Sequence, residues 1–470
     1  MAQQLMGSFT EDAVRALSEF LKEPAWLRDF RLESFRAYAS LPQEKNPLYT
    51  KYAYVSSFDG STFGVLPQKS KVDLRSFFKD YLTGRENNIM LQGNETEVHS
   101  ELEQSVAASG VRLLPFHEAL RKDEPMVKRL LEKRLVKSED DRYAALVNAF
   151  FNSGTIAQVP RDVRVPVPLR RMLVTSNPTT GMLDLTFLLA DEGSRLVFLD
   201  ELYSGASQGP SLVGSTIEIY AGSGSKVDYS SIQLLDGQAV HISNRAIEIQ
   251  RDATATVSAL SLGAGVVRSR MNFMLNGRGS VAEGFEIFFT NEKQHYDFES
   301  NLIHNSPDST GSTQARGVLK GESQSIFKGM IKIGPSAKNS RAYLAHHAML
   351  LERTAKSDGV PGLEILTNEV KATHSASVAQ LDEEQLFYLN ARGLATDEAK
   401  KMIVLGFFEP VLSRVPVEQT REGARFMIDG KWEGIKRRLV DRETLIAMTG
   451  EVEPEARPTE DIFERHYKYR

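Results

Sequence analysis

The chain has 470 residues, enough for two or three domains, and its 41% apolar and 25% charged residues are an ordinary soluble composition. A formal net charge of -5 argues against a dominant nucleic-acid interaction, and no apolar run is long enough for a membrane span. The sequence contains no cysteine, which excludes disulfides, cysteine–zinc sites, cysteine nucleophiles and any persulfide carried by this chain.

Helical signals dominate the first part of the chain. Ser8 and Glu11 have the spacing of a capping box in front of an apolar face that includes Val14 and Leu17, and Pro24 is expected to end or kink that helix. Further helices are predicted over residues 29–39, 99–109 and 126–151. The N-terminal MAQQLMGSFTEDAV lacks a basic segment followed by an apolar one, so we expect no secretion signal and a cytoplasmic location.

The pattern changes after residues 160–168, PRDVRVPVP, which predict an extended linker. From about Leu169, pairs of apolar residues two positions apart indicate short strands with one buried face. These pairs are Ile217/Ile219, Ile232/Leu234, Val240/Ile242, Ile247/Ile249, Leu260/Leu262, Phe273/Leu275, Phe285/Ile287 and Ile331/Ile333. No helical spacer of a dozen residues separates them, which excludes a βαβ sheet and leaves a sandwich or a β-solenoid.

Two helices follow the strands. Asp382 and Gln385 have the spacing of a cap and its third helical residue, and Gly393 is expected just beyond the helix end. Thr396 is expected to cap the second helix, whose predicted apolar face contains Ala399, Met402, Ile403, Gly406 and Phe407. We expect these helices to cover the last coil of the strand region.

The stretch from Pro361 to Phe408, PGLEILTNEVKATHSASVAQLDEEQLFYLNARGLATDEAKKMIVLGFF, resembles the closing core of the SufB/SufD family, scaffold subunits of the SUF iron–sulfur cluster assembly system. A strand histidine, His374, and an FYL…RG turn at 387–393 follow in the family's order. The resemblance implies a right-handed parallel β-helix core flanked by helical regions. It divides the chain into an N-terminal helical or mixed region (1–160), the β-helix (161–380) and a C-terminal helical, ATPase-docking region (381–470).

Two departures separate the SufB type from the SufD type. SufB-type chains carry a cysteine at the position of His346, within the segment 341–350 of this chain. They also carry a glutamate directly after the strand histidine, where this chain has Ser375. The resemblance therefore implies a SufD-like, non-catalytic subunit that supports iron acquisition. The alternative within the family is a divergent SufB-like scaffold that has lost its cysteine.

The resemblance also implies partners. A SufD-like chain pairs with a SufB-like chain through their β-helices and binds a SufC-like ABC-type ATPase through its C-terminal helices. ATP would act only through that partner, because the sequence has no Walker-A motif. A transient iron or iron–sulfur cluster would be shared with the SufB-like subunit, while flavin binding stays open. The isolated chain is further expected to form a homodimer along an exposed solenoid edge.

Three histidines are candidate metal ligands, because a neutral imidazole binds Fe(II) without thiolates. His374 is the first choice; on a strand it shares a face with Val370 and Ala372. His346 is included because it occupies the family's thiol position, and as a neighbour of His347 it must face the opposite side of its strand. His304 lies near a Ser/Pro turn. The alternative for each is a packing or turn-stabilising side chain.

The predicted ATPase-docking residues are Phe387, Tyr388, Arg392, Gly393, Phe407 and Phe408. The competing interpretation is that the aromatic side chains are buried between helix and solenoid, and that the Arg–Gly pair ends a helix.

The enzyme-class alternative is a carbohydrate-active β-helix, a lyase or hydrolase that uses paired carboxylates such as Glu283, Glu286 and Asp297. Glycine-rich segments at 222–224 and 277–279 lie between strands and open no helix, so they predict turns and not phosphate-binding loops.

Overall fold

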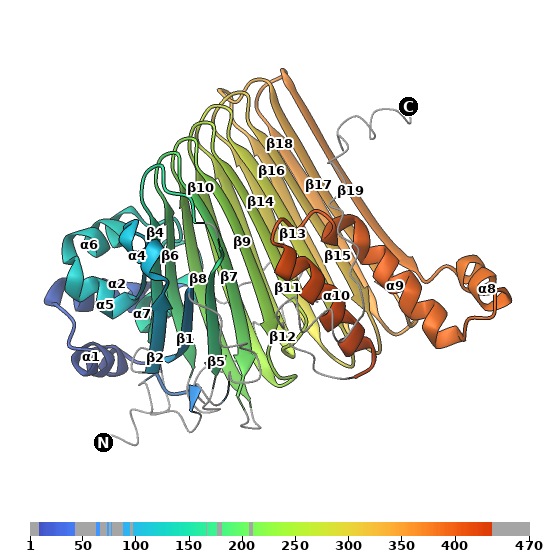
Figure 1. The fold of residues 1–470 in the computed structure, drawn as a ribbon, viewed down its shortest axis with the longest axis horizontal. Coiled ribbons are helices and arrows are strands. Elements are labelled where there is room, and N and C mark those ends of the chain that lie inside the picture. The colour runs from blue at the N-terminus through green and yellow to red at the C-terminus, as the bar shows by residue number, and fades with distance from the viewer. Residues whose placement is uncertain are drawn as a thin grey trace.

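The computed structural model describes residues 9–42, 63–65, 73, 74, 77, 88–94, 97–165, 167–175, 181–205 and 210–434. Their centre is a parallel β-solenoid of about 8 turns, with helices before and after it in the chain (Figure 1). This confirms the predicted β-helix and excludes the sandwich. Among the described helices, none has the length and apolar character needed to cross a membrane.

The strands form two sheets. The ten-stranded sheet has the order β19-β17-β15-β13-β11-β9-β7-β5-β1-β2 and the nine-stranded sheet the order β18-β16-β14-β12-β10-β8-β6-β4-β3. The strands of the first sheet are β1 Asn88–Asn94, β2 Glu97–Leu102, β5 Leu169–Thr175, β7 Arg195–Ser204, β9 Lys226–Leu234, β11 Thr254–Ser261, β13 Val281–Thr290, β15 Thr310–Leu319, β17 Ser340–Leu350 and β19 Val370–Gln380. Those of the second are β3 Arg112–Pro115, β4 Ser153–Val159, β6 Met182–Ala190, β8 Ser211–Ala221, β10 Ala239–Ile249, β12 Val266–Leu275, β14 His295–His304, β16 Gln324–Ile333 and β18 Lys356–Ile365.

Each coil contributes one strand to each sheet. Val266 of β12 pairs in parallel with His295 of β14, which pairs with Gln324 of β16. The parallel pairing continues to β18 and β19. The predicted strand pairs lie in this array, except that 240/242 and 247/249 belong to one strand, β10, and Leu262 lies just beyond β11. β1 and β4 precede residue 161 and pair in parallel with β5 and β6. The proposed domain boundaries at 160 and 380 remain a prediction.

Alternate residues of every strand face the space between the sheets. On β12 these are Val267, Met271, Phe273 and Leu275, all fully buried. The coils turn at residues such as Asp252 and Asp308, which have φ of 54° and 59°. At Gly277 a Cβ would lie 1.9 Å from the backbone nitrogen of Arg251, so only glycine fits between these turns. The segments 222–224 and 277–279 are turns between strands, as expected.

The N-terminal helices pack at the start of the solenoid (Figure 1). They are α1 Glu11–Phe20, α2 Ala25–Ser40, α4 Gln104–Ala108, α5 Phe116–Lys122, α6 Glu124–Lys133 and α7 Arg142–Phe150. Thr10 caps α1 by accepting from the Ala13 N–H at 3.2 Å. The cap expected at Ser8 falls outside the described residues.

Two helix predictions in this region are wrong in part. Residues 99–102 of the segment 99–109 belong to β2, which pairs antiparallel with β1, and the helix α4 takes only residues 104–108. The helix expected over 126–151 is broken between α6 and α7. There Arg134 Nε binds the buried Glu218 carboxylate at 2.6 Å and the backbone N–H groups of Leu135 and Val136 donate to the same carboxylate, so the chain leaves the helix to satisfy a buried charge.

The C-terminal helices are α8 Glu383–Ala391, α9 Thr396–Leu412 and α10 Glu418–Trp432. Asp382 caps α8 and Gly393 follows it with φ of 93°, as predicted. Thr396 is the first residue of α9 and not its cap. The helices do not cover the last coil as expected. Instead α9 and α10 lie on the outer face of the ten-stranded sheet, because Val404, Phe408 and Val411 pack on an apolar patch of its strands (Figure 1). Of the predicted apolar face of α9, Ala399 is buried and Phe407 is partly buried, whereas Met402 is exposed and Val404, Phe408 and Val411 are buried in its place.

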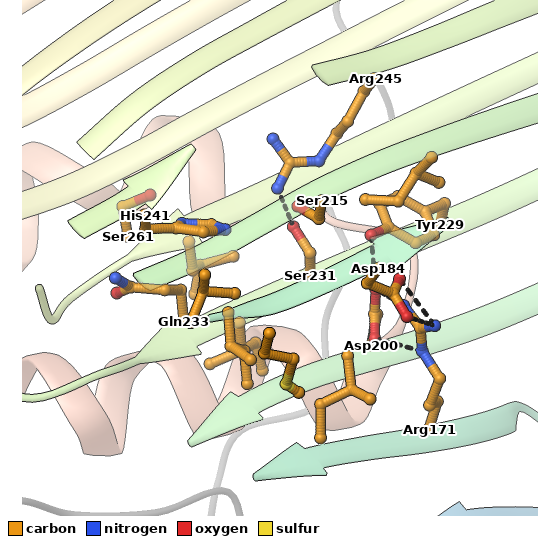
Figure 2. A pocket seen from close by; sticks show the side chains of 17 residues that line it. Arg171, Asp184, Asp200, Ser215, Tyr229, Ser231, Gln233, His241, Arg245 and Ser261 are labelled. Carbon is orange, nitrogen blue, oxygen red and sulfur yellow. Dashed lines mark hydrogen bonds and ion pairs between the residues drawn. The ribbon is translucent and has the colours of Figure 1, made fainter. Parts of the chain in front are cut away.

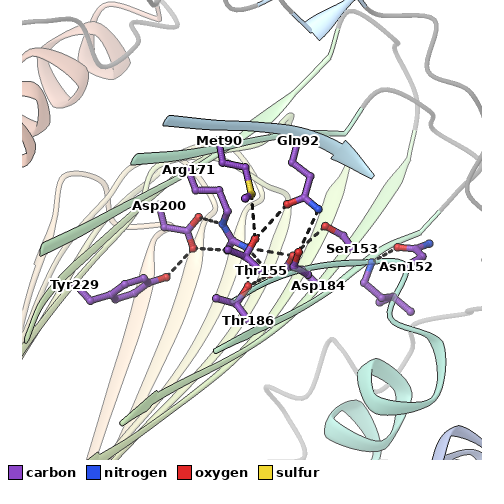
Figure 3. A network of polar contacts seen from close by, with 12 residues as sticks. Met90, Gln92, Asn152, Ser153, Thr155, Arg171, Asp184, Thr186, Asp200 and Tyr229 are labelled. Carbon is purple, nitrogen blue, oxygen red and sulfur yellow. Dashed lines mark hydrogen bonds and ion pairs between the residues drawn. The ribbon is translucent and has the colours of Figure 1, made fainter. Parts of the chain in front are cut away.

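A buried ionic network joins the first coils of the solenoid (Figure 3). Arg171 is fully buried; its Nε and Nη2 donate to Asp200 at 2.9 and 2.8 Å, and its Nη1 lies 3.1 Å from Asp184 Oδ2. The Tyr229 hydroxyl donates to Asp200 at 2.9 Å. Burial opposes the charge of Arg171, but the two carboxylates raise its pKa, so it stays ionised. The network ties three successive strands of one sheet to β6 of the other.

We expect Arg171→Met to lower the free energy of unfolding by about 3–5 kcal/mol, because it leaves two buried carboxylates without their cation. Chemical unfolding measured by circular dichroism tests this. The control is Arg161→Met, which removes an exposed pair with Glu192 (3.3 Å) and should cost less than about 1 kcal/mol. Equal losses in the two variants would contradict the structural role of the network.

Candidate functional site

The solenoid ends at β18 and β19 without a further described strand on their far side. Inward-facing positions that are buried in earlier coils are exposed here. Val378 is 42% exposed although its register partner, Ala348, is buried, and Leu363 is 40% exposed opposite the buried Ile331. Ile365 and Leu366 are exposed beside them. Among the described residues, the last coil therefore presents the interior of the solenoid as a surface, which we call the open end.

His374 lies on β19, in the edge strand of the ten-stranded sheet. It pairs in register with the inward-facing Leu344, and Val370 and Ala372 on the same face pack against the solenoid core. Its side chain is exposed, and none of the described residues forms a hydrogen bond or ion pair with it. The imidazole thus stands on the interior face of the last coil with both nitrogens available.

His346 lies one coil further in, on β17, and is fully buried. Its ring stacks on Phe327 with the centroids 5.0 Å apart, and neither ring nitrogen has a hydrogen-bond partner among the described residues. A Cβ at Gly359 would lie 2.7 Å from Nδ1, so only glycine at that position leaves the ring its space. Burial lowers the pKa of His346 to about 4, and the imidazole is neutral at pH 7.

The two neighbouring histidines face opposite sides, as their adjacency predicts. His347 points out of the solenoid, where its Nδ1 lies 2.6 Å from the Ser377 hydroxyl. Burial, followed by the charge of Arg316, lowers its pKa.

His304 ends β14 inside the solenoid. It is fully buried, and its Nδ1 lies 2.7 Å from the hydroxyl of Ser309, which also donates to the Ser306 carbonyl. Burial lowers the pKa of His304 to about 4. The three candidate histidines do not gather at one point: within the described parts of the chain, no group of three or more His, Asp or Glu side chains could hold a metal ion.

The predicted docking residues fall into two sets. Phe387 and Tyr388 lie on α8, a helix with no buried residue, and are 74% and 56% exposed. The guanidinium of Arg392 lies over the Tyr388 ring at 4.8 Å and donates to its hydroxyl, and Gly393 ends the helix. Figure 1 shows α8 extending away from the solenoid beyond α9. Met402 on α9, which was not among the predicted docking residues, is exposed as well.

The other two residues belong to the contact between α9 and the sheet. Phe408 is fully buried among apolar side chains of the strands. Phe407 is partly buried: its ring lies 5.0 Å from the Arg316 guanidinium, which also donates to its carbonyl. Both hold α9 on the sheet and so position α8.

Lys431 of α10 also helps to hold the C-terminal helices on the ten-stranded sheet. Its Nζ donates to the Leu262 carbonyl at 2.5 Å and to Gln294 at 3.1 Å. Burial lowers its pKa from 10.5 to about 7, against the opposing charge of Glu292.

The carboxylates considered for glycoside chemistry are not paired. Glu283 faces outward and binds Arg414 at 2.6 Å, whereas Glu286 faces inward on the same strand and is fully buried. Asp297 lies on the other sheet and binds Lys328 at 2.8 Å. No two of them face a common space, so the structure does not support the carbohydrate-active alternative.

The apolar residues of the open end were not identified from the sequence. Leu363, Ile365 and Val378 continue the inward pattern of the preceding coils, and that pattern alone gives no sign that no coil follows. The order of the predicted elements could have revealed the open end. Helices follow the last predicted strand, so no later strand is available to pair with it.

Comparison with known proteins supplies the family. The family model described as SUF system FeS cluster assembly, SufBD core domain, matches residues 173–407, from β5 into α9. A Staphylococcus haemolyticus protein described as an iron-sulfur cluster assembly SufBD family protein is 25% identical over 435 residues, which cover 89% of this chain and 92% of the relative. Proteins of the same description from Staphylococcus aureus strains MRSA252 and USA300 match at the same identity and coverage.

We expect the stabilising contribution of Lys431, which holds α10 on the sheet, to depend on pH. In the folded chain Lys431 loses its proton near pH 7, but in the unfolded chain only near pH 10.5. The unfolded state therefore binds more protons between these values, and stability should rise with pH across this window. The difference in unfolding midpoint between the wild type and Lys431→Gln, followed from pH 7 to 10, measures it. A difference that stays constant or falls would contradict the assignment.

Proposed function

This chain belongs to the SufBD family of SUF iron–sulfur cluster assembly proteins, and from that premise we propose that it is the SufD-like scaffold subunit. Its partners would be a SufB-like scaffold and a SufC-like ATPase in the cytoplasm. The absence of cysteine supports this proposal, because a scaffold without thiolates needs a neighbour to supply sulfur. The alternative, a divergent SufB-like scaffold, would lack its sulfur acceptor.

The observation that carries the proposal is the position of His374. It is an exposed imidazole without a described partner, on the interior face of the last coil, among apolar side chains that are left uncovered. A second solenoid end placed here would bury Leu363, Ile365 and Val378 and bring its own side chains to the imidazole. His374 would then provide one ligand to the iron that the complex assembles into clusters. The thiolates of the SufB-like partner would provide the other ligands.

His346 and His304 fit packing roles better than direct metal binding. Both are enclosed by the solenoid, so neither imidazole reaches its surface. A direct ligand must reach the shared site, and only His374 of the three candidates is exposed. The same open end would join two copies of the chain when it is isolated, as a substitute for the SufB-like partner.

We propose further that α8 is the ATPase-docking element. Its aromatic pair is exposed on a helix that buries none of its own residues, while Phe407 and Phe408 anchor the neighbouring helix. Exposed aromatic residues on a protruding helix are typical hot spots of protein interfaces. Because α9 is fixed to the ten-stranded sheet, movement of the docked ATPase would be transmitted to the solenoid.

We expect His374→Ala to lower the iron content of the anaerobically purified three-subunit complex about tenfold or more, by removing a direct ligand. Iron and sulfide analysis measures this after co-expression with both partners. The matched control is His347→Ala on the outer face of the adjacent strand, which should retain wild-type iron. Unchanged iron in His374→Ala, with the complex intact, would remove the metal assignment.

We expect the double variant Phe387→Ala, Tyr388→Ala to weaken binding of the SufC-like ATPase about tenfold or more, since the loss of a hot-spot aromatic costs at least about 2 kcal/mol. Titration calorimetry measures the affinity, and thermal unfolding should be unchanged because both side chains are exposed. Phe20→Ala, at an exposed aromatic on α1, is the control. Wild-type affinity in the double variant would exclude α8 as the docking site.

A further inference from the structure

The polar side chains that line the pocket inside the early coils balance in charge (Figure 2). Arg171 and Arg245 face the same space as the carboxylates of Asp184 and Asp200. Two guanidinium groups and two carboxylates therefore line one pocket, and no counter-ion is missing there. The outer face of the ten-stranded sheet has a different balance.

The outer face of β15 carries a row of polar side chains beside the C-terminal helices. Ser312, Gln314 and Arg316 occupy alternate positions of this strand. They share the face of Val318, which packs in the cluster under α9, whereas Ala315 belongs to the solenoid core. Alternate residues of a strand are roughly 7 Å apart, so the row presents three polar groups at a regular spacing.

Each member of the row has an unused hydrogen-bond donor. Ser312 and Gln314 are buried, and neither the Ser312 hydroxyl nor the Gln314 amide nitrogen has a hydrogen-bond partner among the described residues. Arg316 donates through Nη1 to the Phe407 carbonyl, but its buried Nε has no such partner in the same part of the chain. Buried polar groups are almost always hydrogen-bonded, so the row indicates an acceptor that still has to be supplied.

The two adjacent strands do not supply this acceptor. Six positions of β13 and β17 flank the row in register: Glu283, Phe285, Ile287, Tyr343, Ala345 and His347. Glu283 is the one carboxylate among them, and it binds the Arg414 guanidinium at 2.6 Å. Arg414 has a further buried donor, Nη1, that no described residue accepts. Within the described ranges Arg316 forms no ion pair, so two guanidinium groups face a single carboxylate.

The described residues end close to the same strand. Gly434 directly follows α10, and the Lys320 ammonium, one residue beyond β15, lies 5.2 Å from the centroid of the Trp432 ring. Along the strand, the row lies within roughly 30 Å of Lys320. The residues 435–450 can span about 50 Å when extended, so the segment that follows them can reach the row.

That segment, EVEPE at 451–455, is acidic at alternate positions. In an extended chain Glu451, Glu453 and Glu455 fall on one side, at the same spacing as the row on β15. Pro454 is unfavourable inside a helix, in which the three carboxylates would diverge. The sequence therefore offers three charged acceptors whose spacing matches that of the three donors.

We propose that the acidic segment 451–455 of this chain binds along the outer face of β15. Its carboxylates accept from the row and from Arg414, and they supply the counter-charge of Arg316. Because Arg316 also holds the Phe407 carbonyl, the bound segment strengthens the attachment of α9 to the ten-stranded sheet. This contact is distinct from the open end and does not depend on the proposed assembly function.

The absence of cysteine allows a direct test in the full chain, because two introduced thiols can be spin-labelled selectively. The labels are attached at Ala456→Cys and at Ser375→Cys, which lies on β19 two strands away from Gln314. Pulsed electron paramagnetic resonance should give one short, narrow distance distribution. Arg316→Gln should broaden it and move it to longer distances. The matched control, Arg251→Gln at an exposed turn, should leave it unchanged.

A broad distribution in the otherwise wild-type labelled chain would overturn the proposal. A narrow one that persists both in Arg316→Gln and in the triple variant Glu451→Gln, Glu453→Gln, Glu455→Gln would overturn it as well. The triple variant replaces no described residue, so it keeps the test decisive if Arg316→Gln does not fold.

A binding measurement identifies the ligand. A fluorescein-labelled peptide of residues 449–461 should bind the full chain that carries the triple variant, and adding Arg316→Gln should weaken this binding about tenfold or more. Fluorescence anisotropy measures the affinity, and competition by inorganic phosphate at equal ionic strength tests a free anion as the alternative. Phosphate binding without peptide binding, or a peptide affinity that Arg316→Gln leaves unchanged, would contradict the assignment.

Discussion

A parallel solenoid buries its interior only where another coil follows, and this constraint determines the rest of the structure. Every inner coil shares its backbone hydrogen bonds and its inward side chains with the coils before and after it. The last coil, β18 and β19, has a described neighbour on one side only. Its inward residues continue the core pattern, so the surface formed there by the described residues is largely apolar and includes the imidazole of His374. An interface is expected where core chemistry is exposed in this way.

The helices at the two ends of the chain pack on different parts of the solenoid. The N-terminal helices pack against the first coils and bury Phe150, Phe187 and Leu212 in a shared core. The C-terminal helices follow the last strand but turn back along the outer face of the sheet, where Phe285 and Ile287 meet Phe408. This placement leaves the open end uncovered by the described helices and carries α8 outward. Under the proposed function, the open end would bind a second solenoid and α8 would bind the ATPase, at separate surfaces of one chain.

Local chemistry in the sequence predicted much of this arrangement. The alternation on β8, β9 and β12, the cap at Asp382 and the turn at Gly393 are short-range signals, and each was correctly assigned. The resemblance of residues 361–408 to a known family supplied the solenoid, which irregular spacing alone could not distinguish from a sandwich. The failures came from long-range contacts. The helix α6 ends at Arg134, which binds a glutamate 84 residues away in the sequence. The helix α9 packs Val404 and Phe408 against an apolar patch that distant strands form. His374 is exposed because no further described coil follows β19. The residues of β19 itself do not indicate where the array of coils ends.

We propose that this chain, which has no thiolates, lends the imidazole of His374 to a metal centre completed by its partner. The most direct measurement is pulsed electron paramagnetic resonance of the reduced complex, assembled from this chain labelled with ¹⁵N-histidine and unlabelled partners. We expect a ¹⁵N hyperfine coupling to the cluster that disappears when His374 is replaced. A cluster without ¹⁵N coupling, or a stable stoichiometric cluster on this chain purified from cells that lack the partners, would contradict it.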